Sequence, residues 1–146
     1  MMMSMNPAFA RPPLVLIVDP VVASRQWLWR TMSQAFGVVE ASSARAARDW
    51  LRSRPDLDAL VVQDELPDQS GRDLVASLVS EQHPVSTRSI VLAKRSPDWV
   101  RIAQTGLTLI ERGDLRALFA KLASWFLVRD AGLARALLRE AERMGA

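Results

Sequence analysis

The sequence has no cysteine, no tyrosine and a single histidine, His83. Without cysteine, disulfides and thiolate metal sites are excluded, and a cytoplasmic location is our expectation. A zinc site would need carboxylates alone, so we expect a structural or solvent-facing role for His83. With only 6 glycines in 146 residues and 24% charged residues, the chain does not have the composition of a disordered protein.

The sequence also lacks a long apolar run and a basic stripe. No stretch is long enough to span a bilayer, and residues 1–13, MMMSMNPAFARPP, lack the continuous apolar core of a signal peptide. The net charge is +3, and the 19 basic residues are interspersed with 16 acids over the whole length. We therefore expect neither a membrane nor a nucleic acid as a partner.

What the sequence does contain is a regular alternation of short apolar runs with helical patterns. It predicts strands over 14–19, 38–42, 58–63, 89–93 and 107–110, and helices over 23–36, 44–53, 71–82, 97–106 and 114–128. Ser24 and Asp114 are expected N-caps, Gly37 the end of the first helix, and Trp27 and Trp50 inward-facing residues. Five βα units in this order predict an α/β fold, a doubly wound parallel sheet covered by helices on both faces.

In such sheets, functional sites lie beyond the carboxyl ends of the strands. Those ends hold Asp19-Pro20, Gln63-Asp64, Ala93-Lys94 and Glu111-Arg112. The segments LIVDP, DALVVQDELPDQSG, IVLAKRS and LTLIERGDLRAL resemble strands one, three, four and five of the receiver domain of bacterial response regulators. The resemblance covers about residues 13–128, and it implies a flavodoxin-like sheet of strand order 2-1-3-4-5. We expect a disordered tail over 1–12 and a helical extension over 129–146.

The resemblance also implies where the family's chemistry would sit. In the family, a carboxylate on strand three accepts a phosphoryl group, Mg²⁺ bridges it to acids of strand one, and a hydroxyl and a lysine bind the phosphoryl oxygens. Here the acceptor position holds Gln63, the second acid position Pro20 and the hydroxyl position Ala93. The lysine position falls on Glu111 or on Arg112, depending on the alignment. Only Asp19 clearly remains, so we expect neither a catalytic site nor a metal or cofactor.

Two interpretations stay open at this point. The first is a non-catalytic pseudo-receiver that binds a signalling protein such as a kinase, a phosphotransferase or an output protein. The second is a phosphoryl-accepting regulator in which Asp64, one residue further on, has become the acceptor. Because side chains alternate along a strand, Asp64 should point away from the face of Gln63 unless a bulge turns it back.

Two candidate partner surfaces combine a tryptophan with basic residues. The first is Arg25, Trp29 and Arg30 on the first helix; the second is Lys94, Arg95, Trp99 and Arg101 near the fourth helix. By the resemblance, both helices lie where receivers contact other proteins. An exposed aromatic side chain between arginines favours a protein interface. The alternatives are a tryptophan packed on a neighbouring helix and an ordinary solvated surface.

The last 18 residues, RDAGLARALLREAERMGA, have the pattern of an amphipathic helix. Its apolar positions recur at three- and four-residue spacing and are Leu133, Leu137, Leu138, Ala141 and Met144. An isolated helix of this length is marginal in water, so its apolar stripe needs a cover. We expect a homodimer in which the fifth helix and this extension pack against their symmetry mates, the alternatives being a helix folded back on the domain or frayed.

Overall fold

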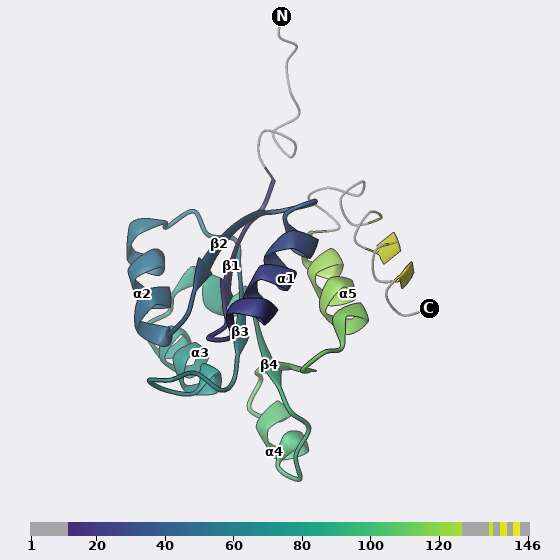
Figure 1. Cartoon of the computed structure of the whole chain (residues 1–146). Coiled ribbons are helices and arrows are strands. Elements are labelled where there is room, and N and C mark those ends of the chain that lie inside the picture. The colour runs from purple at the N-terminus through teal and green to yellow at the C-terminus, as the bar shows by residue number, and fades with distance from the viewer. Residues whose placement is uncertain (1–11, 127–134, 136–137, 140–141, 144–146) are drawn as a thin grey trace, which may run out of the picture.

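In a computed structural model of the chain, the structure describes residues 12–126, 135, 138, 139, 142 and 143. Five parallel strands form one sheet in the order β2-β1-β3-β4-β5 (Figure 1). They are β1 (Leu14–Val18), β2 (Gly37–Ala41), β3 (Ala59–Gln63), β4 (Ser89–Ala93) and β5 (Thr108–Glu111). The predicted fold class and strand order are confirmed.

Helices follow the strands and cover both faces of the sheet. They are α1 (Val22–Met32), α2 (Ala44–Ser53), α3 (Gly71–Ser80), the short 3-10 helix η2 (Pro84–Arg88), α4 (Trp99–Ala103) and α5 (Leu115–Phe126). In Figure 1, α1 and α5 lie on one side of the sheet and α2 and α3 on the other. No helix in the described part of the chain is long and apolar enough to cross a membrane.

The core consists of two apolar layers, one on each face of the sheet. On β3, Ala59 and Val61 face α1 and α5, whereas Leu60 and Val62 face α2 and α3. Strands β1, β3 and β4 are buried along their whole length, which is why they appear in the sequence as continuous apolar runs. This alternation continues past the strand ends and decides toward which face each polar residue there points.

The first helix differs most from the sequence prediction. It ends at Met32 rather than at Phe36, and Gly37 is the first residue of β2. The chain turns after Met32, and Phe36 packs in the core with its ring 5.8 Å from that of Phe126. Trp27 is 42% exposed, so its predicted inward placement is wrong, because Leu28 and Met32 occupy the buried stripe.

The capping residues were predicted in part. Asp114 caps α5, since its Oδ1 accepts from the Ala117 amide at 3.0 Å, but the N-cap of α1 is Val21 and not Ser24. His83 has a structural role, because its Nδ1 accepts from the Val85 amide at the start of η2. Trp50 is half-buried, and its indole N–H donates to the Glu40 carbonyl at 2.8 Å.

Elsewhere the element bounds differ by a few residues. Helix α2 and strand β4 have the predicted bounds, whereas α3 ends at Ser80 and α4 is shortened to Trp99–Ala103. In the extension, Arg135, Leu138, Arg139, Glu142 and Arg143 are helical and exposed. Leu133, Leu137, Ala141 and Met144 lie outside the described residues, as does the tail over 1–11, so the homodimer stays a prediction.

The start of α3 lies directly against the end of β3. A Cβ atom on Gly71 would lie 2.4 Å from the carbonyl oxygen of Gln63 and 3.1 Å from the Cα of Asp64. The Gly71 amide donates to the Asp64 carbonyl at 2.8 Å, which fixes this approach. Only glycine therefore lets the helix begin so close to the strand that carries the candidate site.

We predict that Gly71→Ala lowers the free energy of unfolding by about 2–3 kcal/mol, because the added methyl group meets backbone that must shift. Urea denaturation measures this loss. The matched control is Gly106→Ala, at φ +92° but with nothing within 4 Å of the new Cβ. It should cost about 1 kcal/mol from backbone strain alone. Equal losses in the two variants would contradict the role given to the close approach.

Candidate functional site

The candidate site lies at the carboxyl edge of the sheet, where four strand ends meet. Val18 of β1 pairs with Val62 of β3, so the next residues, Asp19 and Gln63, are neighbours across the two strands. In the same way Ala93 of β4 pairs with Glu111 of β5. The strand register therefore gathers the predicted site residues at one edge.

Asp19 is a buried carboxylate that the chain itself surrounds with donors. Only 1% of its surface is exposed. Its Oδ1 accepts from the Val21 amide at 2.9 Å, and its Oδ2 accepts from the Ser24 hydroxyl and, at 3.4 Å, from Gln63 Nε2. The neighbouring Pro20 offers no side-chain oxygen.

These residues do not fit the Mg²⁺ ion that the resemblance implies. A hard cation needs several oxygen ligands, and Mg²⁺ loses its water reluctantly. Here one carboxylate is available, and both of its oxygens already accept hydrogen bonds from the chain. In the described part of the chain, no three histidine, aspartate or glutamate side chains gather closely enough to hold a metal ion.

Gln63 occupies the end of β3 with its side chain on the α1 and α5 side. It is 5% exposed, and its Nε2 donates to Asp19. Its Oε1 is buried without a hydrogen-bond partner, the one such side-chain atom among the described residues. An unpaired buried acceptor costs about 1–3 kcal/mol. An amide is not a nucleophile for phosphoryl transfer, so this position holds no phosphoacceptor.

Asp64 points to the opposite face, toward α3. Its Oδ1 accepts from the backbone amide of Arg72 and from the Arg72 Nε, both at 3.1 Å. The carboxylate thus sits at the N-terminus of α3, where the free amides and the helix dipole favour a negative charge. Its neighbour Glu65 is exposed and forms a 3.9 Å ion pair with Lys94.

Glu111 and Arg112, the two residues between which the sequence left the choice open, are placed differently at the end of β5. Glu111 ends β5 with an exposed side chain, whereas Arg112 lines two cavities together with Gln63 and Leu92. The backbone amide of Arg112 donates to the Ala93 carbonyl at 2.9 Å, which holds this residue against the end of β4. One cation therefore faces the site, and the methyl group of Ala93 supplies no hydroxyl.

The two cavities lie on either side of Gln63. One of about 210 Å³ lies beside the β4–α4 segment and is lined by Asp64, Ala93, Lys94, Ser96 and Trp99 among others. The other, of about 300 Å³, lies beside α1 and α5 and is lined by Ser24, Trp27, Leu28 and Leu115. No sequence pattern indicates either cavity, because each is formed by segments far apart in the chain.

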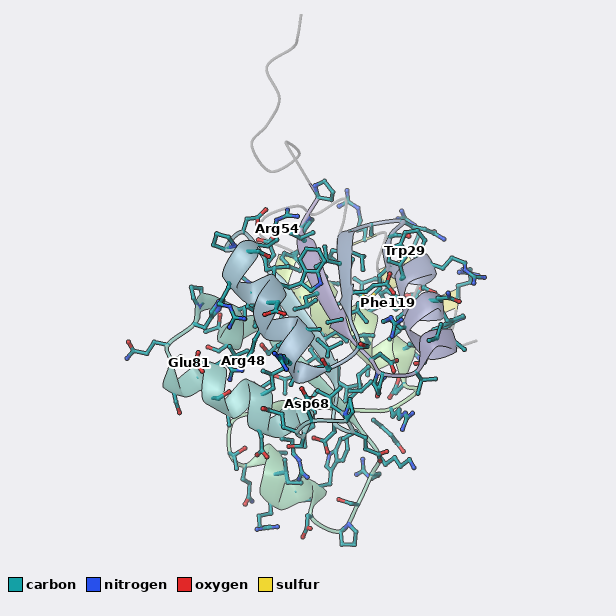
Figure 2. The ribbon with its side chains drawn as sticks, turned by 60° about the vertical axis from the view of Figure 1, so that its left-hand side comes forward. Trp29, Arg48, Arg54, Asp68, Glu81 and Phe119 are labelled. Carbon is teal, nitrogen blue, oxygen red and sulfur yellow. The ribbon has the colours of Figure 1, made fainter. Side chains whose placement is uncertain are left out.

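A third feature that the sequence did not indicate is the anchoring of the loop between β3 and α3. Asp68 in this loop accepts from the Ala44 amide at 3.0 Å and from the Arg45 amide at 2.9 Å, at the N-terminus of α2. Arg48 of α2 bonds the Ser77 hydroxyl and Glu81, at the end of α3. Figure 2 shows Arg48, Glu81 and Asp68 along the same side of the domain. The loop after Gln63 is thus tied to α2, and α2 is in turn tied to α3.

The first candidate partner surface is only partly as expected. Trp29, labelled in Figure 2, is 42% exposed. Together with Gln26, Arg30 and Glu40 it lines a surface hollow of about 410 Å³. Arg25, by contrast, is bound within the domain. Its Nε pairs with Glu40 at 3.2 Å, and one of its amino groups donates to the Asp19 carbonyl at 2.8 Å.

The second candidate surface has exposed charges but no freely exposed ring. Lys94, Arg95 and Arg101 are exposed. Trp99 is half-buried, packs against the core and lies under the Arg95 guanidinium, 5.4 Å from the ring centroid. This tryptophan is a wall of the 210 Å³ cavity rather than a free anchor.

Comparisons with known proteins gave no match for the sequence but several for the structure. No family model matches the sequence, and no curated protein matches it. The structure, however, superimposes on a response regulator receiver protein of Pseudomonas putida with a TM-score of 0.67 and 22% identity, over 79% of this chain and 98% of that one. The chain has the receiver fold. The signal receiver domain of a putative Luxo repressor protein from Vibrio parahaemolyticus matches with a TM-score of 0.64 and 20% identity, over 88% and 95% of the two chains.

A chemotaxis protein of Vibrio cholerae also matches this receiver fold, with a TM-score of 0.60 and 21% identity, over 70% of this chain and 88% of that one. At such identities the likeness establishes the fold alone. What the candidate site of this chain can do therefore has to be argued from its own residues.

The anchoring of the loop predicts a pH dependence. Hydrogen bonds from the Arg45 and Ala44 amides lower the pKa of Asp68 below its ordinary value of 3.8. Because the folded-state pKa is depressed, the stabilisation is present above pH 3.8 and is lost as the pH falls through the folded-state value. We expect Asp68→Asn to be less stable than the native chain near pH 7, and the difference to shrink in acid.

Urea midpoints at about pH 7 and about pH 3 measure this difference. Asp98→Asn, which removes an exposed aspartate from the β4–α4 segment, serves as the control for the loss of one charge. A stability difference between Asp68→Asn and the native chain that stays constant over this pH range would contradict the role given to Asp68.

Proposed function

We propose that this protein is a cytoplasmic pseudo-receiver, a non-catalytic protein-binding or scaffold module of bacterial two-component signalling. One observation carries the proposal. The phosphoacceptor position holds Gln63, a buried amide that donates to Asp19, the one acid that remains of the family's set. An amide cannot accept the phosphoryl group, and Asp19 alone does not hold the cation that the reaction needs.

The second candidate is a regulator that is phosphorylated on Asp64. One observation favours it, because Asp64 lines the 210 Å³ cavity together with Lys94 and Ser96. Two observations weigh against it. The Asp64 carboxylate is already paired with Arg72 and the start of α3, and it lies on the opposite face from Asp19. We therefore prefer the non-catalytic module.

The exposed face of α1 supports a role in protein binding. Four of the large hydrophobic side chains exposed in the described part of the chain, Val21, Val22, Trp27 and Trp29, belong to α1 or to its N-cap. The helix carries the exposed Arg30 but no acid, while Arg25 is paired with Glu40 of β2. Exposed apolar side chains beside an exposed basic residue suit a signalling protein whose contact surface combines apolar and acidic side chains.

The C-terminal extension belongs to the same proposal. Leu138 is helical and 43% exposed in the single chain, which leaves an apolar side chain uncovered. A homodimer through this segment would bury it by an isologous contact. In this proposal the protein presents fixed surfaces to its partners and has no phosphorylation switch.

We predict that the full chain takes up no phosphoryl group when it is incubated with acetyl phosphate and Mg²⁺, as measured by intact-mass spectrometry. The reason is the absence of a carboxylate beside Asp19. The positive control is the double variant Pro20→Asp/Gln63→Asp, which restores both missing carboxylates. A single phosphoryl adduct on the native chain that Asp64→Asn removes would instead establish the second candidate.

A further inference from the structure

Strand β2 lies at one side of the sheet and has a free edge. It ends the strand order, so among the described residues it pairs with β1 alone. On the β1 side, the Gly37 amide donates to the Pro13 carbonyl at 2.9 Å. Because the backbone groups of successive strand residues point to opposite sides, those of Val38 and Glu40 point away from the sheet. We call this free side of the strand the β2 edge.

Most of the outward backbone groups at the β2 edge lack a partner. The Glu40 carbonyl accepts from the Trp50 indole N–H at 2.8 Å, which agrees with its outward direction. The Val38 amide, the Val38 carbonyl and the Glu40 amide form no hydrogen bond within the described part of the chain. Residues 37–40 are half-buried. Unpaired backbone groups on an edge strand are a template for a further strand.

A hollow lies beside the β2 edge on each face of the sheet. The one that Trp29 and Glu40 line, of about 410 Å³, is on the α1 face. The other, of about 310 Å³, is on the α2 face and is lined by Ala46, Asp49, Trp50 and Ser53. Figure 1 shows β2 between α2 and α1. Because side chains alternate along a strand, those of an added strand would enter the two hollows in turn.

The charges beside the β2 edge favour an acidic partner. Arg25 and Glu40 pair with each other at 3.2 Å on the α1 face, and Asp49 pairs with Arg52 on α2. Arg30 is exposed in the first hollow, and its side chain forms no hydrogen bond or ion pair with the described residues. One positive charge therefore remains for a bound segment to neutralise.

We propose that the β2 edge binds an extended acidic segment of a partner protein, which adds a strand to the sheet. Its backbone pairs with Val38 and with the Glu40 amide. On the α1 face, an apolar side chain contacts Trp29 and, two residues on, an acidic side chain meets Arg30. The apolar residue between them enters the hollow beside Trp50. The inference rests on the proposed function, because it specifies how the module binds its signalling partner.

The test uses the full ¹⁵N-labelled chain and the acetylated, amidated peptide Thr-Val-Leu-Val-Glu-Thr, whose leucine contacts Trp29 and whose glutamate meets Arg30. We expect saturable NMR shifts of the Val38 and Glu40 backbone amides and of the Trp29 indole. The same peptide with glutamine in place of glutamate lacks the charge, so it should bind about threefold more weakly.

Two methylated peptides test the backbone pairing. One is N-methylated at the leucine and the other at the valine that follows it, and in an added strand only one of these two amides points toward β2. One methylated peptide should therefore bind about tenfold more weakly, and the other should bind like the parent peptide. Equal affinities of the two methylated peptides would overturn the proposal.

A pair of arginine variants tests the charge contact. Arg30→Gln should weaken the glutamate peptide by about threefold and leave the glutamine peptide unchanged. Arg116→Gln removes an exposed arginine of α5 and is the matched control, which should change neither affinity. An Arg30→Gln variant that binds both peptides like the native chain would contradict the assigned contact. Retained folding of each variant is read from the same spectra.

The proposal is also overturned if the edge amides show no saturable shift up to about 5 mM peptide, where a ligand with a millimolar Kd fills most sites. Protection of the Val38 and Glu40 amides from hydrogen exchange in the free chain would overturn it too, because a second copy or another segment of the chain would then occupy the edge. Neither result bears on phosphorylation, which the intact-mass measurement reports separately. The failure of the peptide site and the failure of the proposed function are thus distinguishable.

Discussion

Along β3, successive side chains point to opposite faces of the sheet, and this alternation at its carboxyl end determines what the site can do. It directs Gln63 toward Asp19 and α1, and it directs Asp64 toward Arg72 and α3. The strand is buried on both faces, so a slip of one residue would move every apolar side chain of β3 into the wrong layer. The close approach of Gly71 to the Gln63 carbonyl holds α3 against the strand and adds to this constraint. The carboxylate of Asp64 therefore cannot replace the amide of Gln63 by a small local change.

Most other polar groups at this edge of the sheet form hydrogen bonds that hold the fold together. Ser24 and the Val21 amide bind the Asp19 carboxylate, and Arg25 joins the Asp19 carbonyl to Glu40 of β2. Asp68 fixes the following loop to α2. In this arrangement the edge of the sheet is held in one conformation by its own hydrogen bonds.

Much of the fold could be predicted from the sequence, and the reasons are physical. Strands buried on both faces appear as continuous apolar runs, so β4 and the order of the elements were predicted correctly. The end of α1 was not, because Phe36 continues the helical apolar spacing although the chain has already turned after Met32. Trp27 was predicted to face inward because it belongs to the apolar stripe read from the sequence. The stripe of α1 that is buried is narrower, with Leu28 and Met32 inside it and Trp27 outside.

The candidate site could be predicted only as a set of residue types. The predicted strand ends identify Asp19, Gln63 and Ala93 as site residues. Spacing alone left Glu111 and Arg112 as equal alternatives, because the choice depends on the face of the sheet on which each side chain lies. The bonds of Asp68 to Ala44 and Arg45 join residues 24 and 23 positions apart, and no sequence period encodes them. The cavities likewise depend on contacts between separate loops.

The central claim is that the Asp19–Gln63 pair leaves this receiver fold without a phosphoryl site. A titration of the full chain with beryllofluoride, a phosphoryl analogue, in the presence of Mg²⁺ tests it most directly when followed by NMR. The account predicts no saturable shift of the backbone amides of Gln63, Asp64 and Lys94, and none at Arg112. Saturable shifts centred on Asp64 that require both Mg²⁺ and beryllofluoride would contradict it.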